Sequence, residues 1–170
     1  MEIKSKIRNY TVEFSEIPEL GCNSNEFYII DSFFEKTEKL NIKKGSEIFY
    51  IDSLESNKEY VSISKVIEWL IKKGFRKNNV IVAVGGGVIQ DISSFIASVL
   101  YRGVSWKFYP TTLLSQGDSC IGSKTSINFG EYKNQIGGFY PPSEVTIDTS
   151  FLYTLPENQI KSGIGEMSHY

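Results

Sequence analysis

The sequence predicts an α/β fold in which helices flank a mostly parallel sheet. Three observations indicate this fold: short apolar runs of β-formers alternate with segments of helical periodicity, the connections are short, and polar residues follow the strands where they end. With 170 residues, 41% hydrophobic and 22% charged, the chain has the composition of a globular domain that buries a full core.

Strands are expected over residues 7–17, 26–30, 47–51, 80–84, 106–109 and 145–148. The first of these is expected at a sheet edge. A helical segment is expected around residues 33–40. Apolar residues at helical spacing predict a second helix over 63–73, which Gly74 ends in the left-handed conformation.

The overall composition excludes several classes of protein. A formal net charge of -2 argues against a nucleic-acid binder. No apolar run approaches the length of a membrane span, and the start of the chain has no signal-peptide core, so we expect no membrane partner. Cys22 and Cys120 show no paired-thiol or metal-ligand spacing, which favours reduced cysteines in a cytoplasmic protein.

Three glycines, Gly85, Gly86 and Gly87, separate the strand over 80–84 from an amphipathic segment. This order is typical of a phosphate cradle, because glycine lets a ligand approach the backbone and a helix N-terminus favours anions. The G-x-G-x-x-G fingerprint of dinucleotide sites is absent, so a plain tight turn is the alternative interpretation.

Polar residues recur where the predicted strands end: Asp31, Asp52, Thr111, Thr112, Asp148 and Thr149. In a parallel sheet the ligand crevice lies at the carboxyl ends of the strands, so this placement predicts a binding site there. The alternative role of Asp31 is to initiate a turn. The alternative role of Asp91, in the first turn of the predicted helix, is to cap that helix.

The stretch from Gly117 to Gly138 is polar and rich in glycine, which predicts a long binding loop. The alternative to ligand binding for each lysine of this stretch is a solvated surface charge. Pro156 starts a further helix, on which Glu166 and His169 would share one face. Such a pair can bind a metal, although two ligands do not close a site.

Five motifs in collinear order resemble 3-dehydroquinate synthase and, more broadly, the sugar-phosphate cyclases. They are GGGVIQD, YRGVSWKFYPTTLLSQGDSCIGSKTSIN, EYKNQIGGFYPP, IDTSFLYTLP and GIGE. The resemblance implies a Rossmann-like NAD-binding domain over residues 1–155. Residues 156–170 would begin the first helix of a C-terminal metal and substrate domain that this chain lacks.

The implied reaction belongs to the shikimate pathway of aromatic amino acid biosynthesis. A carbon–oxygen lyase of this family converts a seven-carbon sugar acid phosphate to 3-dehydroquinate with release of phosphate. The resemblance implies NAD and zinc or cobalt as cofactors, with the remaining metal ligands outside this chain, and a homodimer. A fragment of this extent would be inactive by itself.

The resemblance also implies roles for individual residues. NAD would be bound by Asp31, Glu55, Lys58, Gly85, Gly86, Gly87, Val88, Asp91, Thr111, Thr112, Lys133, Phe151 and Thr154. The catalytic and substrate residues would be Asp118, Lys124, Asn134 and His169, with Arg102 reaching the substrate of a neighbouring subunit. Glu166 would bind the metal.

The family usually reads E-V-I-K where this chain reads Glu166-Met167-Ser168-His169, so His169 replaces a lysine. Gln90 stands where the family has a glycine. One alternative is therefore a related sugar-phosphate cyclase that acts on another substrate. A metal-dependent polyol or alcohol dehydrogenase shares the glycine turn, but the cationic residues Lys124 and Lys133 favour a cyclase. A nucleotide-binding module without catalysis is the third alternative.

Overall fold

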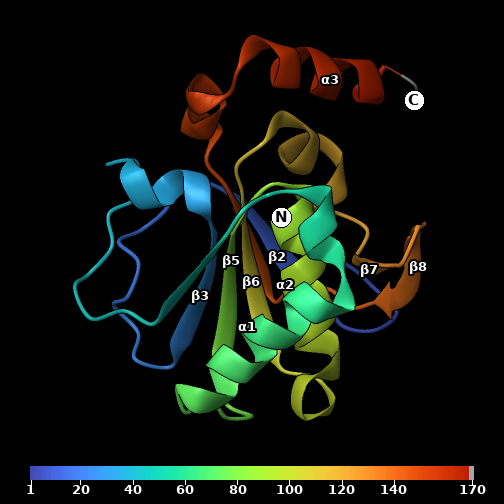
Figure 1. Cartoon of the computed structure of the whole chain (residues 1–170). Coiled ribbons are helices and arrows are strands. Elements are labelled where there is room, and N and C mark those ends of the chain that lie inside the picture. The colour runs from blue at the N-terminus through green and yellow to red at the C-terminus, as the bar shows by residue number, and fades with distance from the viewer. Residues whose placement is uncertain (169–170) are drawn as a thin grey trace.

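A seven-stranded sheet in the order β1-β2-β9-β6-β5-β3-β4 forms the centre of the computed structural model, which describes residues 1–168 (Figure 1). Its strands are β1 (Glu2–Ile3), β2 (Tyr10–Phe14), β3 (Glu26–Asp31), β4 (Ile48–Ile51), β5 (Val80–Gly85), β6 (Ser105–Pro110) and β9 (Glu144–Ile147). All neighbours from β2 to β4 pair in parallel, and only β1, which forms an edge hairpin with β2, is antiparallel among them. The mostly parallel α/β fold is confirmed.

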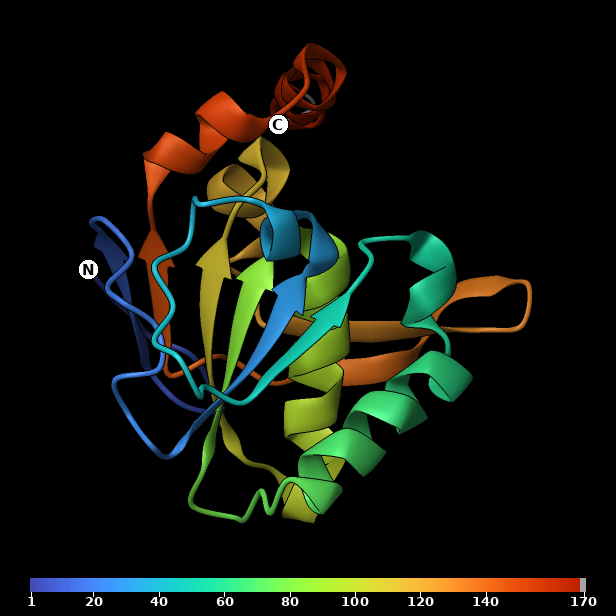
Figure 2. The same cartoon turned by 60° about the vertical axis from the view of Figure 1, so that its left-hand side comes forward.

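Two helices, α1 (Tyr60–Lys72) and α2 (Gly87–Val99), cover the same face of this sheet (Figure 2). In α1 the buried residues Ile63, Val66 and Leu70 recur at helical spacing, as the sequence predicts. They join the main core, in which Trp106 is the largest fully buried side chain. Gly74 has a φ of +84°, so it ends α1 in the expected left-handed conformation.

On the opposite face of the sheet, strand side chains pack with Leu20, Phe34 and Phe151, which come from a loop and two 3₁₀ helices. The helix predicted over residues 33–40 is wrong in length. The chain instead forms a 3₁₀ helix, η1 (Ser32–Lys36), in which only Phe34 is buried. Thr37 already has extended dihedral angles, φ -118° and ψ 150°, so the helix cannot continue. With one buried residue, the segment has too little apolar surface to stabilise further helical turns.

The stretch predicted as a long binding loop is also different: it forms an antiparallel hairpin of β7 (Lys124–Phe129) and β8 (Tyr132–Phe139). Thr125 and Ile127 are buried at alternate positions of β7, which packs on α2. Their burial explains the strand, because one face of β7 has a core to pack against. By contrast, β8 is exposed along its whole length.

The carboxyl ends of the parallel strands meet a layer of short elements at one end of the molecule (Figure 2). These are η1, the π-helical turn η4 (Ser115–Ser119), the 3₁₀ helix η5 (Thr149–Thr154) and α3 (Glu157–Met167). Pro156 precedes α3, as predicted. None of the helices formed by residues 1–168 has the length and apolar character needed to cross a membrane.

The sheet changes direction between β3 and β5. After β3 the chain moves outward to the edge strand β4, then returns to form β5 on the other side of β3 and continues to β6. Such a reversal opens a crevice at the carboxyl ends of the two central strands, where ligands of open α/β sheets bind.

Candidate functional site

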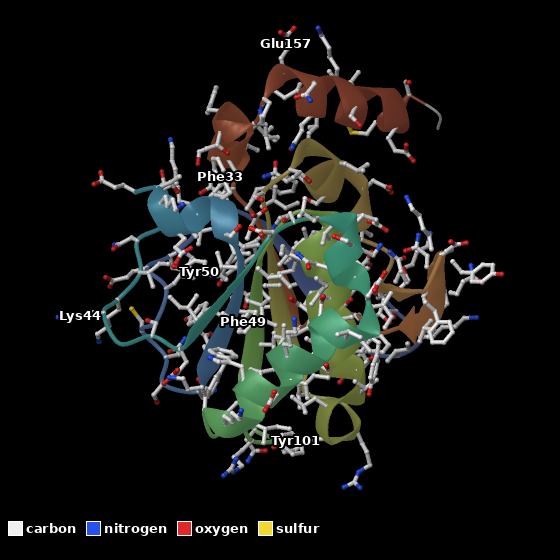
Figure 3. The ribbon with its side chains drawn as sticks, viewed as in Figure 1. Phe33, Lys44, Phe49, Tyr50, Tyr101 and Glu157 are labelled. Atoms are coloured by element: carbon white, nitrogen blue, oxygen red, sulfur yellow. The ribbon has the colours of Figure 1, made fainter. Side chains whose placement is uncertain are left out.

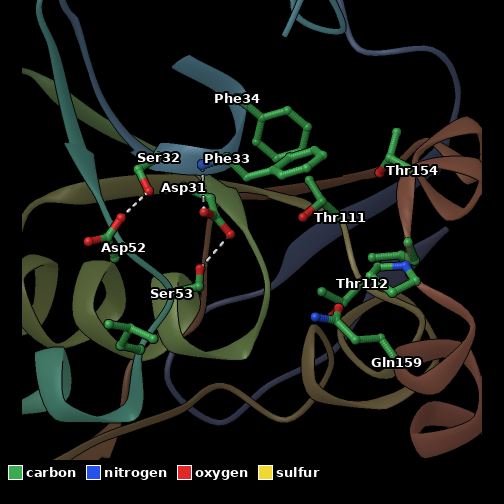
Figure 4. A pocket seen from close by; sticks show the side chains of 13 residues that line it. Asp31, Ser32, Phe33, Phe34, Asp52, Ser53, Thr111, Thr112, Thr154 and Gln159 are labelled. Atoms are coloured by element: carbon green, nitrogen blue, oxygen red, sulfur yellow. Dashed lines mark hydrogen bonds between the residues drawn. The ribbon is translucent and has the colours of Figure 1, made fainter. Parts of the chain in front are cut away.

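A cavity of about 400 Å³ lies at this reversal point (Figure 4). Asp31 comes from the end of β3, Asp52 from the segment after β4, Thr111 and Thr112 from the segment after β6, and Thr154 from η5. The structure therefore brings together Asp31, Thr111, Thr112 and Thr154, which the sequence predicts for a cofactor site. Strand-end polar residues meet here because parallel strands end at one edge.

Asp31 is held by the local backbone as well as by a neighbouring segment. Its Oδ1 accepts a hydrogen bond of 3.0 Å from the Phe33 backbone N–H, which caps η1. Its Oδ2 accepts a hydrogen bond from the Ser53 hydroxyl, and Ser32 donates in the same way to Asp52 (Figure 4). Asp31 thus both initiates the turn and lines the cavity.

The three glycines have different environments. A Cβ on Gly85 would lie 2.4 Å from Cγ1 of Ile89, and one on Gly86 would lie 2.8 Å from Cγ2 of Thr112. Both glycines are therefore required by packing, and Gly86 brings the turn against the cavity wall at Thr112. Gly87 has no atom within 4 Å of a Cβ position, so it is the glycine that leaves room for a ligand.

Gly87 also begins α2, after Gly86 at the N-cap position. The first N–H groups of a helix lack intrahelical partners, and the helix dipole is positive at this end. An anionic group can therefore approach the backbone beside Gly87. The next predicted cofactor residue, Val88, is partly buried and packs against the main core.

A second group of predicted residues meets about a buried lysine. Lys58, at the end of the 3₁₀ helix η2 (Glu55–Lys58), is 5% exposed. Its Nζ lies 2.8 Å from Oδ2 of Asp91 and 3.5 Å from Oε1 of Glu55, and it donates to Oδ1 of Asn134 at 2.8 Å. Two anions and an amide compensate the buried charge.

The position of Asp91 differs from the prediction. It is the fifth residue of α2, and the first turn of α2 contains no acidic residue, so the carboxylate does not cap the helix. It forms the ion pair with Lys58 instead. Burial raises the pKa of Asp91, although the hydrogen bond and charge of Lys58 oppose this shift.

Asn128 of β7 joins the same group and was not predicted. Its amide donates to Oε1 of Glu55 at 2.9 Å, and its Oδ1 accepts from the Asn134 backbone N–H at 2.9 Å. Asn134 has a φ of 55°, so Asn128 helps to hold it in a left-handed conformation. A polar residue next to the buried position Ile127 was the only sequence signal for this role.

Asp118 lies in the π-helical turn η4. Side chains of Gln116 and Gln90 hold this turn in place through hydrogen bonds. Gln116 donates to the carbonyls of Pro110 at 3.0 Å and Asp148 at 2.9 Å. Gln90 donates to the Ser119 carbonyl at 2.6 Å and accepts from the Ser119 hydroxyl at 2.7 Å. The glutamine that replaces the family's glycine thus ties α2 to the Asp118 turn.

Other predicted residues lie outside both groups. Arg102 follows α2 in η3 (Leu100–Arg102), at the amino ends of the strands, whereas the cavity is at their carboxyl ends. Figure 3 shows the neighbouring Tyr101 at the opposite end of the molecule from Phe33. Lys124 and Lys133 are exposed on the β7–β8 hairpin.

Phe151 lies in the core, where it packs edge-on against Phe34 with ring centroids 5.5 Å apart. Glu166 is exposed on α3, and no three histidine, cysteine, aspartate or glutamate side chains of residues 1–168 are grouped to hold a metal ion. His169 lies outside the described residues.

Comparison with known proteins identifies the family. The family model described as the N-terminal part of 3-dehydroquinate synthase matches residues 48–162. A 3-dehydroquinate synthase of Prochlorococcus marinus is 37% identical over 164 residues, which cover 91% of this chain and 45% of that protein. The chain therefore spans less than half the length of this relative.

Two solved cyclase structures have the same fold. The 2-epi-5-epi-valiolone synthase of Streptomyces hygroscopicus, solved with NAD+ and Zn2+, has a TM-score of 0.82 and 28% identity, covering 96% of this chain and 49% of that one. A 2-deoxy-scyllo-inosose synthase complexed with carbaglucose-6-phosphate, NAD+ and Co2+ has a TM-score of 0.78 and 26% identity, with the same coverage of both chains. The chain belongs to the 3-dehydroquinate synthase family.

Proposed function

We propose that this chain is the NAD-binding part of a 3-dehydroquinate synthase, the carbon–oxygen lyase that converts a seven-carbon sugar acid phosphate to 3-dehydroquinate with release of phosphate. The observation that carries the proposal is the cavity at the sheet reversal, where Gly86 of the glycine turn lies against the lining residue Thr112. The NAD+ in two related cyclase structures supports it. The matched 3-dehydroquinate synthases favour this reaction over that of another cyclase.

The residues that line the cavity fit a dinucleotide. We assign the adenosine ribose to Asp31, whose carboxylate accepts hydrogen bonds from hydroxyl groups. The pyrophosphate is assigned to the backbone beside Gly87, where a side chain would fill open space. Thr111, Thr112 and Thr154 complete the pocket. When bound, NAD supplies a hydride acceptor for a substrate alcohol.

The Lys58 group is assigned to the boundary between cofactor and substrate. Asp91 pairs with Lys58, and Lys58 donates to Oδ1 of Asn134, so the amide that we expect to contact substrate is oriented before substrate arrives. Asp118 would face the substrate from the anchored turn, and Lys124 would meet its anionic groups through charge-assisted hydrogen bonds.

The remaining assignments concern the whole enzyme. Glu166 is proposed as one metal ligand, and the described residues do not complete a metal site, so we assign the other ligands to residues outside them. Residues 1–155 would form the cofactor domain and 156–170 the start of a second domain. We also assign cofactor contacts to Val88, Lys133 and Phe151, and a catalytic role to His169. Arg102 would serve the neighbouring subunit of a cytoplasmic homodimer.

Calorimetric titration of the chain with NAD tests the cofactor assignment. Gly87→Val should weaken NAD binding by at least about tenfold, because the added side chain fills the cradle. Gly138→Val is the matched control, since Gly138 also has no atom within 4 Å of a Cβ but lies on β8. Absence of NAD binding to the native chain, or equal binding by Gly87→Val, would overturn the assignment.

The reaction itself is tested with the full-length gene product. Phosphate release is measured with the seven-carbon substrate, NAD and Zn2+, and release is the expected result. Turnover of a different sugar phosphate without release from the seven-carbon substrate would favour the related cyclase instead.

A further inference from the structure

Two serine–carboxylate pairs join the ends of β3 and β4 at the rim of the cavity (Figure 4). Ser32 donates its hydroxyl to Asp52, and Ser53 donates its hydroxyl to Asp31. The pairs cross between the two strand ends, so each segment supplies one serine and one carboxylate. Both hydroxyl protons are used within the rim.

This arrangement presents hydrogen-bond acceptors to the cavity. A carboxylate oxygen has two lone-pair directions, and each oxygen of Asp31 already accepts one hydrogen bond. Asp31 therefore keeps acceptor capacity, and the bond from Ser32 orients the second carboxylate, Asp52, beside it. The rim suits a ligand that brings hydroxyl donors.

The charge of the rim is not balanced by a cation. Among the described residues that line the cavity, none is lysine, arginine or histidine. Two carboxylates near each other repel an additional anion, and they do so more strongly beside low-dielectric walls than in water. A phosphate group at this rim would meet like charge without compensation.

Apolar side chains stand beside the carboxylates. Phe33, Phe34 and Leu54 line the same cavity, and Phe33 and Leu54 are 51% and 58% exposed. Apolar walls with a few polar groups at one edge are typical of small-molecule and cofactor sites. Such walls beside an acceptor rim fit a base with its attached ribose.

We propose that Asp52, held by Ser32, is a specificity-determining residue that selects an unphosphorylated ribose over a ribose 2′-phosphate. This inference rests on the proposed function, because it concerns the dinucleotide assigned to this cavity. Asp31 and Asp52 together accept hydrogen bonds from the ribose hydroxyls of NAD. The 2′-phosphate of NADP places a dianion against the same two carboxylates.

The test compares NAD and NADP binding by calorimetry in the native chain and in Asp52→Asn. The native chain should bind NADP at least about tenfold more weakly than NAD. Asp52→Asn keeps an acceptor for Ser32 but loses the charge, so NAD binding weakens, NADP binding tightens and the ratio falls about tenfold.

Glu35→Gln is the matched control. Glu35 is an exposed acid of η1 that does not line the cavity, so its loss removes the same net charge nearby. The NAD-to-NADP ratio should stay at the native value in this variant. An equal fall in both variants would show that overall charge, and not Asp52, sets the preference, which overturns the inference.

The outcomes separate the two proposals. If the native chain does not bind NAD, the cofactor assignment fails and the specificity inference fails with it. If NAD binds but NADP binds equally well, or Asp52→Asn leaves the ratio unchanged, the inference alone is overturned. Circular dichroism melting of each variant confirms that the binding values are those of folded protein.

Discussion

Replacing Lys58 with methionine should destabilise the fold strongly, because the residue compensates buried charge. Lys58 is 5% exposed and its Nζ lies 2.8 Å from Asp91, whose side chain is 20% exposed. Methionine fills a similar volume but leaves Asp91 and the Asn134 amide without their partner. The loss therefore comes from an uncompensated carboxylate more than from a cavity.

The expected magnitude follows from this burial. Removing one partner of a buried ion pair costs about 3–5 kcal/mol, and Asp91 retains some solvent, so we expect about 3 kcal/mol at neutral pH. The loss should shrink in acid. Burial already raises the pKa of Asp91, and removal of Lys58 should raise it further. Stability lost at high pH is then regained as the pH falls through this raised pKa, because the protonated acid is neutral.

Urea unfolding measures the free energy of unfolding of Lys58→Met, of Asp91→Asn and of the double variant. The double variant should recover part of the loss, since it leaves no buried unpaired charge. Lys72→Met is the matched control, because the Lys72–Glu68 pair is 2.6 Å long but 72% and 62% exposed. Equal effects of Lys58→Met and Lys72→Met would refute the reasoning.

Two further predictions concern single side chains. Iodoacetamide at pH 8 should label the exposed Cys22 and spare Cys120 until urea unfolds the chain, because Cys120 is buried and burial raises its pKa to about 11. Labelling of Cys120 in the folded chain would contradict this. The pKa of Asp148 is lowered: partial burial acts to raise it, but hydrogen bonds from Ser150 and Ile17 outweigh burial. The ionised Asp148 therefore stabilises the folded chain, and this contribution is lost as the pH falls below about 4. Acid unfolding, followed by circular dichroism, should depend less on pH in Asp148→Asn than in the native chain.

The strands and α1 could be predicted because each follows from a local side-chain pattern. Ile63, Val66 and Leu70 show the helical period, and their burial confirms it. The segment after Asp31 contains two phenylalanines that resemble a helical pattern, but only Phe34 is buried. Composition alone did not reveal that the chain turns extended at Thr37.

The β7–β8 hairpin was not predicted, because its local sequence suggests less regular structure than the chain forms. Its glycines and polar residues are typical of a loop, and the alternation of Thr125 and Ile127 is weak as a signal. Contact with α2 supplies the apolar surface that makes this alternation a strand. Pairing with β8 then satisfies its backbone hydrogen bonds.

The sequence by itself determined the sheet, the glycine turn before α2 and the placement of Asp31, Thr111 and Thr112 at one edge, because parallel strands align their carboxyl ends. Only the tertiary structure decided which residues act together. Asn134 reaches Lys58 across 76 positions of the chain, and Gly86 is required by Thr112 whereas Gly87 faces open space. Such relations depend on distances between segments remote in sequence, which local patterns do not encode.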